Sequence, residues 1–296
     1  MSRKTEINLK TQLEQESSII APYVYDCLTA RMAENTGFKT FVLSASSVAM
    51  TYAMPDLSLL SVEDMIQTSA RVADYLPYPL ITEFTNGFSQ TPYGVYHNVK
   101  RLLNSGICGV MIDDTSGDKE GEVVSEEVFY AKIVAAKEAV KGGDCMVIAV
   151  TAANEACGLD ACIQRLQTCI ALGADAVMCR GLKLAEDCEK LGTAVEGIKL
   201  LDAFADDDAA GAMQIKDAAA FGYSIALVRY VEKANLYGLM QFGMRTKRDN
   251  TTVYTDYHDY DGKLPSMDHH ILLSNQWREL EMEIKKDLSI LEHTGK

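Results

Sequence analysis

The sequence alternates eight times between a short apolar, β-branched run and a longer segment whose apolar residues recur with helical period. This pattern is typical of a parallel sheet covered by helices, because its strands are buried on both faces. The runs are Ile19–Val24, Thr40–Ser44, Leu80–Phe84, Cys108–Asp113, Met146–Thr151, Ala176–Arg180, Lys199–Ala203 and Ser224–Arg229. Eight alternations in one chain predict an α/β protein, a closed (β/α)₈ TIM barrel rather than a doubly wound sheet.

Several classes of protein are excluded by pattern and charge. No GxGxxG or GxxxxGK[ST] motif stands between a strand and a helix, which argues against binding of dinucleotides or nucleoside triphosphates. The formal net charge of −14 argues against nucleic-acid binding. No apolar run reaches the length of a membrane span and the first residues are polar, so we expect a cytoplasmic protein without membrane association. The eight cysteines form no CxxC pair, and we expect reduced, structural thiols.

The repeat ends after Gly238, where a polar, aromatic stretch precedes the helical segment SNQWRELEMEIKKDLSILEH. We expect residues 1–296 to form a single barrel domain, with residues 239–296 as a C-terminal helical extension. The helix around Trp277 has an apolar stripe that lies outside the barrel repeat. A neighbouring subunit can bury that stripe, and the sequence therefore predicts a homo-oligomer.

The active site of such a barrel is built at the carboxyl ends of its strands. Tyr25 follows the first strand, and the small residues Ser44, Ala45 and Ser46 follow the second. Backbone N–H groups of this small-residue turn could hold a carboxylate or phosphonate, although any tight turn after a strand favours small residues.

Charged residues follow four further strands. Glu83, Asp113 and Asp114 are hard oxygen ligands at two neighbouring strand ends, suited to Mg²⁺, or else solvated loop acids. Arg180 and Arg229 end the sixth and eighth runs. Each could bind an anionic ligand through its guanidinium group or form a structural ion pair with Glu83, Asp113 or Asp202.

Several segments together resemble the isocitrate lyase/phosphoenolpyruvate mutase superfamily, and methylisocitrate lyases within it. They include APYVYDCLTARMAENTGFKTFVLSASSVAM, PLITEFTNGF, GVMIDDT, VIAVTAANEACGLDACIQRL and GADAVMCRGL. The resemblance implies a (β/α)₈ barrel that exchanges a C-terminal helix between subunits of a tetramer or dimer. It also implies Mg²⁺ or Mn²⁺ chemistry, in which the metal stabilises an enolate-like oxyanion of a small 2-oxo or 2-hydroxy acid.

Some residues match the family motifs directly. Ser44, Ala45 and Ser46 match the turn that holds a substrate carboxylate, and Asp56 matches the aspartate that follows it. Tyr25 and Arg229 complete the predicted substrate site. The D-x-D metal motif is Glu83-Phe84-Thr85 here, and the E-D pair is Asp113-Asp114. The resemblance thus assigns Glu83, Asp113 and Asp114 to the metal, and Glu83 and Asp113 also to catalysis.

Three motifs depart from the family. The lyase motif K-[KR]-C-G-H is replaced by the shorter Thr115-Ser116-Gly117-Asp118-Lys119-Glu120-Gly121-Glu122, which lacks the cysteine and keeps Lys119 as a candidate catalytic lysine. Val150 stands where the A-R-T-D-A motif has its arginine. Arg180 stands where a P-E motif has its glutamate, and this predicts a relocated positive charge that acts in catalysis.

These features leave three hypotheses for the function. The first is a metal-dependent lyase or decarboxylase that breaks a C–C bond in a small 2-oxo or 2-hydroxy carboxylate through an enolate-like intermediate. The second is a binding protein of the same fold that has lost catalysis. The third is a mutase or hydrolase acting on a P–C bond, as in phosphonopyruvate chemistry. The sequence specifies neither the substrate nor the reaction.

Overall fold

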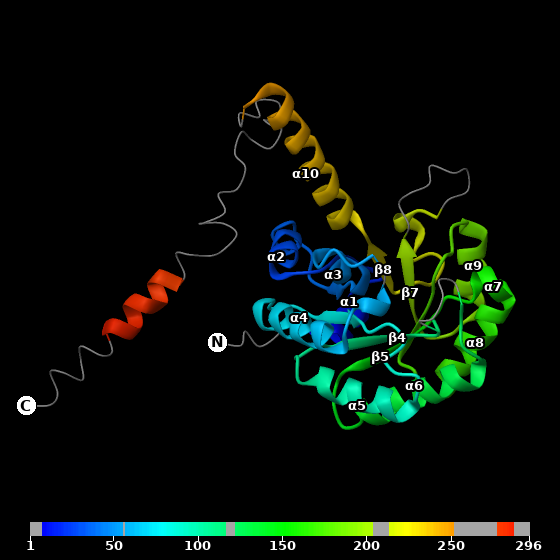
Figure 1. Cartoon of the computed structure of the whole chain (residues 1–296). Helices are drawn as coiled ribbons and strands as arrows, with labels where there is room; N and C mark the ends of the chain where they lie inside the picture. Colours follow the sequence, from blue (N-terminus) through cyan, green and yellow to red (C-terminus); the bar gives the residue numbers. More distant parts are fainter. Residues whose placement is uncertain (1–7, 56, 117–121, 204–212, 252–276, 287–296) are drawn as a thin grey trace, which may run out of the picture. The chain divides into compact units, whose positions relative to one another are not determined.

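A computed structural model of the protein describes residues 8–55, 57–116, 122–203, 213–251 and 277–286. The chain divides into two compact units, Met1–Asn235 and Leu236–Lys296. The first unit contains the strands, and Figure 1 shows them with the helices that surround them.

Eight parallel strands form a closed barrel in the order of the sequence, and β1 pairs with β8 to close it. The strands are β1 (Ile19–Val24), β2 (Phe41–Leu43), β3 (Leu80–Glu83), β4 (Gly109–Asp113), β5 (Met146–Thr151), β6 (Ala176–Cys179), β7 (Ile198–Ala203) and β8 (Ile225–Val228). Seven of the predicted runs contain one of these strands, and the eighth, Lys199–Ala203, misses only the first residue of β7, which confirms the (β/α)₈ barrel. Ser44, Arg180 and Arg229 lie one residue beyond their strands.

Helices surround the strands in the first unit, and α10 continues into the second. They are α1 (Leu9–Gln15), α2 (Cys27–Asn35), α3 (Ala45–Thr51), η1 (Leu57–Leu59), α4 (Val62–Tyr75), α5 (Pro92–Leu103), α6 (Glu126–Val140), α7 (Asn154–Cys157), α8 (Leu159–Ala171), α9 (Ala185–Ala194), η2 (Ile215–Asp217) and α10 (Tyr230–Asp249). Several begin at capping residues. Asp26 and Thr29 form a capping box at α2, and Ser61 and Asp64 form one at α4. These side chains accept hydrogen bonds from backbone N–H groups that the first helical turn leaves unpaired.

Two apolar layers make up the core. Side chains such as Val42, Ile81 and Met111 fill the inside of the barrel. The alternate residues of the same strands, such as Val110 and Ile112, pack outward against the helices. Successive side chains of a strand point to opposite faces, so residues of even separation share a side of the barrel wall.

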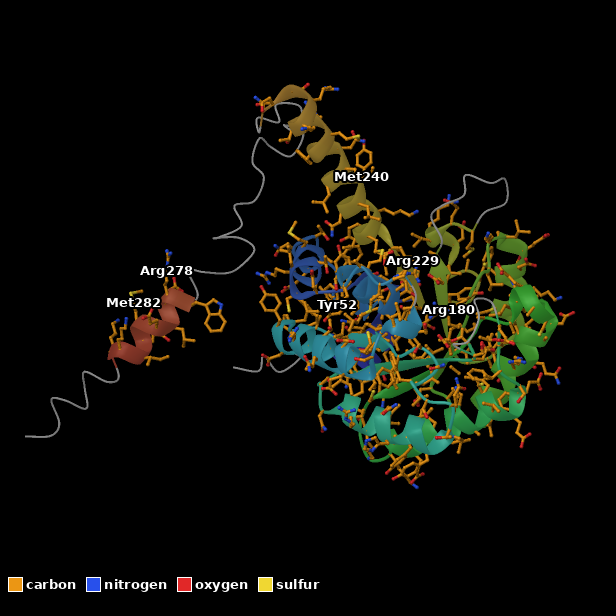
Figure 2. All side chains as sticks on the ribbon, viewed as in Figure 1. Tyr52, Arg180, Arg229, Met240, Arg278 and Met282 are labelled. Carbon is orange, nitrogen blue, oxygen red and sulfur yellow. The ribbon has the colours of Figure 1, made fainter. Side chains whose placement is uncertain are left out.

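The second unit contains the C-terminal part of α10 and a helix over residues 277–286. Large apolar side chains on these segments are exposed, and Figure 2 labels Met240 and Met282 among them. Trp277 is also exposed, at 63%. The predicted extension otherwise falls largely on residues 252–276 and 287–296, outside the described residues, so helix exchange stays a prediction. No helix among the described residues is long and apolar enough to cross a membrane.

Gly192 in α9 provides a test of how closely the helical layer packs. A Cβ atom at this position would lie 1.9 Å from the backbone carbonyl oxygen of Phe221. We expect Gly192→Ala to lower the free energy of unfolding in urea by about 1–3 kcal/mol, because backbone must move to relieve the overlap. Gly143→Ala is the matched control: its Cβ would meet the Val140 carbonyl at an ordinary 3.5 Å. Equal stability of the two variants would contradict this packing.

Candidate active site at the mouth of the barrel

Five charged residues follow inward-facing apolar residues by two positions, and their side chains therefore also face the barrel axis. They are Glu83, Asp113, Arg180, Asp202 and Arg229, which follow Ile81, Met111, Met178, Leu200 and Leu227. All five lie within one residue of the carboxyl ends of their strands. The structure thus brings together four of the predicted site residues, Glu83, Asp113, Arg180 and Arg229, and adds Asp202.

Arg180 contacts two acids through a single nitrogen. Its Nη2 donates a hydrogen bond to Glu83 Oε1 at 3.1 Å and lies 3.7 Å from Asp113 Oδ2. Glu83 and Asp113 are almost fully buried, whereas the Arg180 side chain is 28% exposed. Part of the guanidinium group is therefore left facing the space above the acids.

The Arg229 side chain is less exposed than that of Arg180. Its Nη2 is 3.6 Å from Asp202 Oδ2 and 4.0 Å from Glu83 Oε1, and its Nη1 is 3.9 Å from Glu232 Oε1. The guanidinium carbon lies 4.0 Å above the ring centre of Tyr23, a cation–π arrangement. Arg229 links the acidic mouth to the apolar interior of the barrel.

Burial and mutual charge determine how these groups ionise. Burial lowers the pKa of Arg180, but Glu83 and Asp113 raise it further, so the guanidinium stays charged. Burial raises the pKa of Asp202, an effect that Arg229 and Arg180 partly oppose. Burial also raises the pKa of Glu232. The two arginines thus face four acids, Glu83, Asp113, Asp202 and Glu232. Burial favours the protonated, neutral form of the last two.

A cavity of about 470 Å³ opens beside Arg180. Its lining combines polar and charged side chains with the apolar Leu57, Leu60 and Phe88, and comes from the segments after β2, β3, β4 and β6. Figure 2 labels Arg180 in the barrel unit. The lining also includes Ala45, Ser46, Glu83, Thr85, Asn86, Gln90, Asp113, Thr115 and Arg180. Arg180 is the one cationic side chain among the described residues of this lining. The cavity is large enough for a small organic acid.

The predicted turn after β2 lies at this cavity. Ser44 caps α3, its Oγ accepting from the Ser47 N–H, while Ala45 and Ser46 line the space. The Ala45 N–H donates to Glu83 Oε2 at 3.1 Å. This N–H group holds a carboxylate of the protein itself, so the turn helps to orient Glu83.

The loop after β3 carries backbone strain. Thr85 has a φ of 42°, and Phe88 has a φ of 52°. A β-branched residue such as threonine seldom adopts this left-handed region, and such strain is concentrated at functional sites. The Thr85 carbonyl accepts the Asp113 N–H at 2.7 Å, which joins the strained loop to the end of β4.

Asp114 points away from the mouth. It follows the outward-facing Ile112 by two positions and is completely buried behind the barrel wall. Its Oδ2 accepts from Arg165 Nη1 at 3.0 Å and Thr151 Oγ1 at 2.6 Å, and its Oδ1 accepts from the Ala152 N–H. Asp114 is held in a structural network with α8, and it is not among the residues that line the cavity.

The remaining predicted residues lie elsewhere. Tyr25 does not line the cavity, and its hydroxyl accepts a hydrogen bond from Asn235. Asp56 and Lys119 fall outside the described residues. Sequence reasoning named Asp202 only as a possible ion-pair partner of the arginines, and it lies 3.6 Å from Arg229; Tyr23 was not named. The inward register of their strands, read in steps of two, was the signal that could have identified them.

Mg²⁺, which the resemblance implies, does not fit the residues present. A magnesium site usually combines one or two carboxylates with several waters. Glu83 and Asp113 could supply the carboxylates, but the guanidinium group of Arg180 already lies between them. Thr85 is neutral, and Asp114 is directed outward. Among the described residues, no cluster of three His, Cys, Asp or Glu side chains is arranged to hold a metal ion.

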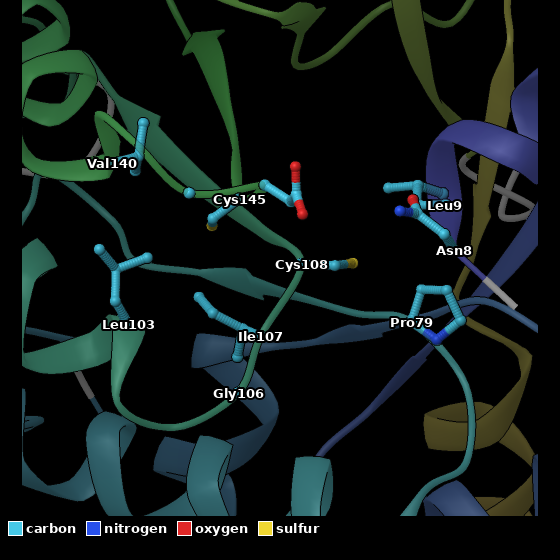
Figure 3. Close-up of a pocket in the computed structure, with 11 residues that line it drawn as sticks. Asn8, Leu9, Pro79, Leu103, Gly106, Ile107, Cys108, Val140 and Cys145 are labelled. Atoms are coloured by element: carbon cyan, nitrogen blue, oxygen red, sulfur yellow. The ribbon is translucent and has the colours of Figure 1, made fainter. Parts of the chain in front are cut away.

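A second cavity, of about 390 Å³, lies at the opposite end of the barrel. It is lined by residues that precede β3, β4 and β5, including Pro79, Cys108 and Cys145, with Leu9 at its edge (Figure 3). Burial raises the pKa of Cys145 to about 12, so its thiol stays protonated and unreactive. The amino ends of barrel strands generally contribute to stability, and the cavity beside Arg180 is therefore the candidate site.

The buried pair of Arg165 and Asp114 leads to a stability prediction. We expect Arg165→Met to lower the free energy of unfolding by about 3–5 kcal/mol, because it leaves the Asp114 carboxylate buried without its cation. Adding Asp114→Asn should restore part of this loss. Arg101→Met breaks a more exposed ion pair with Glu63 and should cost far less. Urea denaturation of these variants checks the ranking, and similar losses in both arginine variants would contradict it.

Asp202 leads to a prediction about pH. Since burial raises its folded pKa, the folded protein holds this proton more tightly than the unfolded chain does. The contribution of Asp202 to the free energy of unfolding is fully present below about pH 4, the pKa of an aspartate in the unfolded chain. It is lost as pH rises through the folded pKa. Asparagine does not ionise, so Asp202→Asn removes this pH-dependent loss of stability. We expect the stability of this variant relative to wild type, measured by urea denaturation, to increase as pH rises above about 4. A relative stability that decreases with pH would contradict the assignment.

Comparison with known proteins supports the resemblance. The chain is 26% identical over 194 residues to 2-methylisocitrate lyase of Aeropyrum pernix, which covers 64% of the chain and 62% of the relative. It is 30% identical over 153 residues to 2-methylisocitrate lyase of Escherichia coli K12, covering 49% and 52%. The matches thus span less than two thirds of the length of these curated relatives.

The fold is shared with a solved structure of oxaloacetate acetylhydrolase in complex with the product oxalate. The TM-score is 0.85 at 24% identity, over 96% of this chain and 99% of the other. The sequence model of phosphoenolpyruvate phosphomutase matches residues 9–233, most of the chain and all eight strands. The chain therefore belongs to this family, within the isocitrate lyase/phosphoenolpyruvate mutase superfamily of C–C lyases and P–C mutases and hydrolases.

Proposed function

We propose that the protein is a lyase that breaks a C–C bond in a small 2-oxo or 2-hydroxy carboxylate through an enolate-like intermediate. The observation that carries the proposal is the cavity beside Arg180, where a charged guanidinium group and two carboxylates line a space suited to a small acid. Relatives named as 2-methylisocitrate lyases and a fold neighbour named as an oxaloacetate acetylhydrolase support this substrate class.

Arg180 is the proposed anchor of the substrate and the group that stabilises its oxyanion. A guanidinium group can form two parallel hydrogen bonds with a carboxylate, or donate to an enolate oxygen as negative charge develops there. Glu83 and Asp113 orient it from below. Either carboxylate can accept a proton from a 2-hydroxyl group that enters the cavity.

Other predicted residues keep supporting roles in this proposal. Ser44, Ala45 and Ser46 bound the substrate space, and Arg229 adds positive charge beneath Glu83. Lys119, Tyr25 and Asp56 stay predicted site residues. We also propose that copies of the chain associate through the C-terminal unit, because α10 exposes several large apolar side chains, including Leu239 and Met240.

Turnover of candidate acids tests the proposed reaction. The purified protein is incubated with oxaloacetate, 2-methylisocitrate and phosphonopyruvate, and products are followed by proton and phosphorus NMR. We expect C–C cleavage of at least one of the two carbon acids. Cleavage of phosphonopyruvate alone would overturn the proposal in favour of a P–C enzyme. Binding of an acid without any turnover would overturn it in favour of a binding protein.

A variant tests the anchor. We expect Arg180→Ala to weaken binding of oxalate by about 30-fold to several thousand-fold, because a buried, charge-assisted contact is lost. Isothermal titration calorimetry measures the affinity, and thermal unfolding measures stability in parallel. Arg101→Ala removes an arginine from an ion pair on the outer surface and should leave oxalate affinity unchanged. A large loss of stability in Arg180→Ala with unchanged affinity would show that Arg180 is only structural.

A further inference from the structure

At the mouth of this barrel, the positive charge beside the acids comes from an arginine side chain and not from a metal ion. One nitrogen of Arg180 lies 3.1 Å from Glu83 and 3.7 Å from Asp113, the two carboxylates that stand at the metal motifs of the family. Each acid also has a second, fixed partner: Glu83 accepts from the Ala45 N–H, and Asp113 accepts from Thr115. Both acids are oriented toward a cation that belongs to the protein.

The other positions of those motifs no longer offer ligands. Thr85 supplies a neutral hydroxyl in place of an acid, and both oxygens of Asp114 accept hydrogen bonds behind the barrel wall. The family arginine is absent at Val150, which lies inside the apolar barrel. These changes are mutually consistent. Compared with the family motifs, this site has fewer acids that could bind a divalent ion, and a guanidinium group lies next to the acids that remain.

We propose that the guanidinium group of Arg180 replaces the divalent cation of the family as the permanent positive charge of this site. The site then holds its anionic ligand without a metal ion. An arginine guanidinium group stays charged across the physiological range. A bound ion can be removed by a chelator, whereas this cation is covalently part of β6 and its following loop.

The replacement also narrows the ligand class, a step that rests on the proposed function. A metal ion accepts oxygen ligands from several directions, but a guanidinium group directs its hydrogen bonds in one plane. Planar anions with two adjacent oxygens, such as oxalate or the enolate form of a 2-oxo acid, match that geometry best.

Manganese binding tests the replacement directly. The full-length protein is titrated with Mn²⁺, and free ion is measured by electron paramagnetic resonance. We expect no saturable binding below millimolar Mn²⁺ in the wild type. Arg180→Ala should bind Mn²⁺ at least about tenfold more tightly, because it leaves Glu83 and Asp113 without their cation. Adding Glu83→Gln should abolish the gain, and Arg101→Ala, the matched control, should show none.

Two outcomes would overturn the inference. One is micromolar Mn²⁺ binding by the wild type that Glu83→Gln removes, a measurement that needs no Arg180 variant to fold. The other is Arg180→Ala that folds, as judged by circular dichroism, and gains no Mn²⁺ affinity.

Oxalate titrations separate this inference from the proposed function. We expect wild-type affinity for oxalate to be the same in EDTA and in Mg²⁺. Binding that requires Mg²⁺ would overturn the replacement while leaving the proposed lyase intact. Absence of both oxalate binding and turnover, together with the expected Mn²⁺ results, would overturn the lyase and leave the replacement standing.

Discussion

The alternation of side chains along the strands of a closed barrel is the constraint on which the rest of this structure depends. Each strand presents every second residue to the axis, so a polar residue near a strand end is committed either to the mouth or to the helical layer. Asp113 and Asp114 are neighbours in sequence and have opposite fates. The first meets Arg180 above the barrel interior, and the second meets Arg165 behind the wall.

The same alternation explains which parts of the site could be predicted from sequence. The apolar runs identified all eight strands, and position at the strand ends identified Glu83, Asp113, Arg180 and Arg229 as neighbours. The metal set was proposed without reference to register, and so Asp114 was included. Ion pairing between strands distant in the chain, such as Glu83 with Arg180, depends on barrel closure and on rotamers. The periodicity predicts that the barrel closes, but it carries no information about rotamers.

Charge compensation connects the interior to the mouth. Asp202 and Arg229 lie between the apolar layers and the cavity, with Tyr23 packed beneath the guanidinium group. Neither carboxyl oxygen of Asp202 has a hydrogen-bond partner among the described residues. A buried acid with this environment is tolerated because it can bind a proton or share the charge of Arg229. The mouth thus contains permanently charged arginines together with an acid, Asp202, whose charge depends on whether it binds a proton.

The anchoring of Asp114 has a consequence for how the mouth meets its ligand. Asp113 and Asp114 share a peptide bond. Thr151 of β5, the Ala152 N–H just after it and Arg165 of α8 hold Asp114 in one orientation. The entropic cost of ordering this end of β4 therefore arises when the protein folds, and not when a ligand binds. A rigid, preformed recess of this kind favours fast capture of compact ligands and discriminates against those that require the wall to yield.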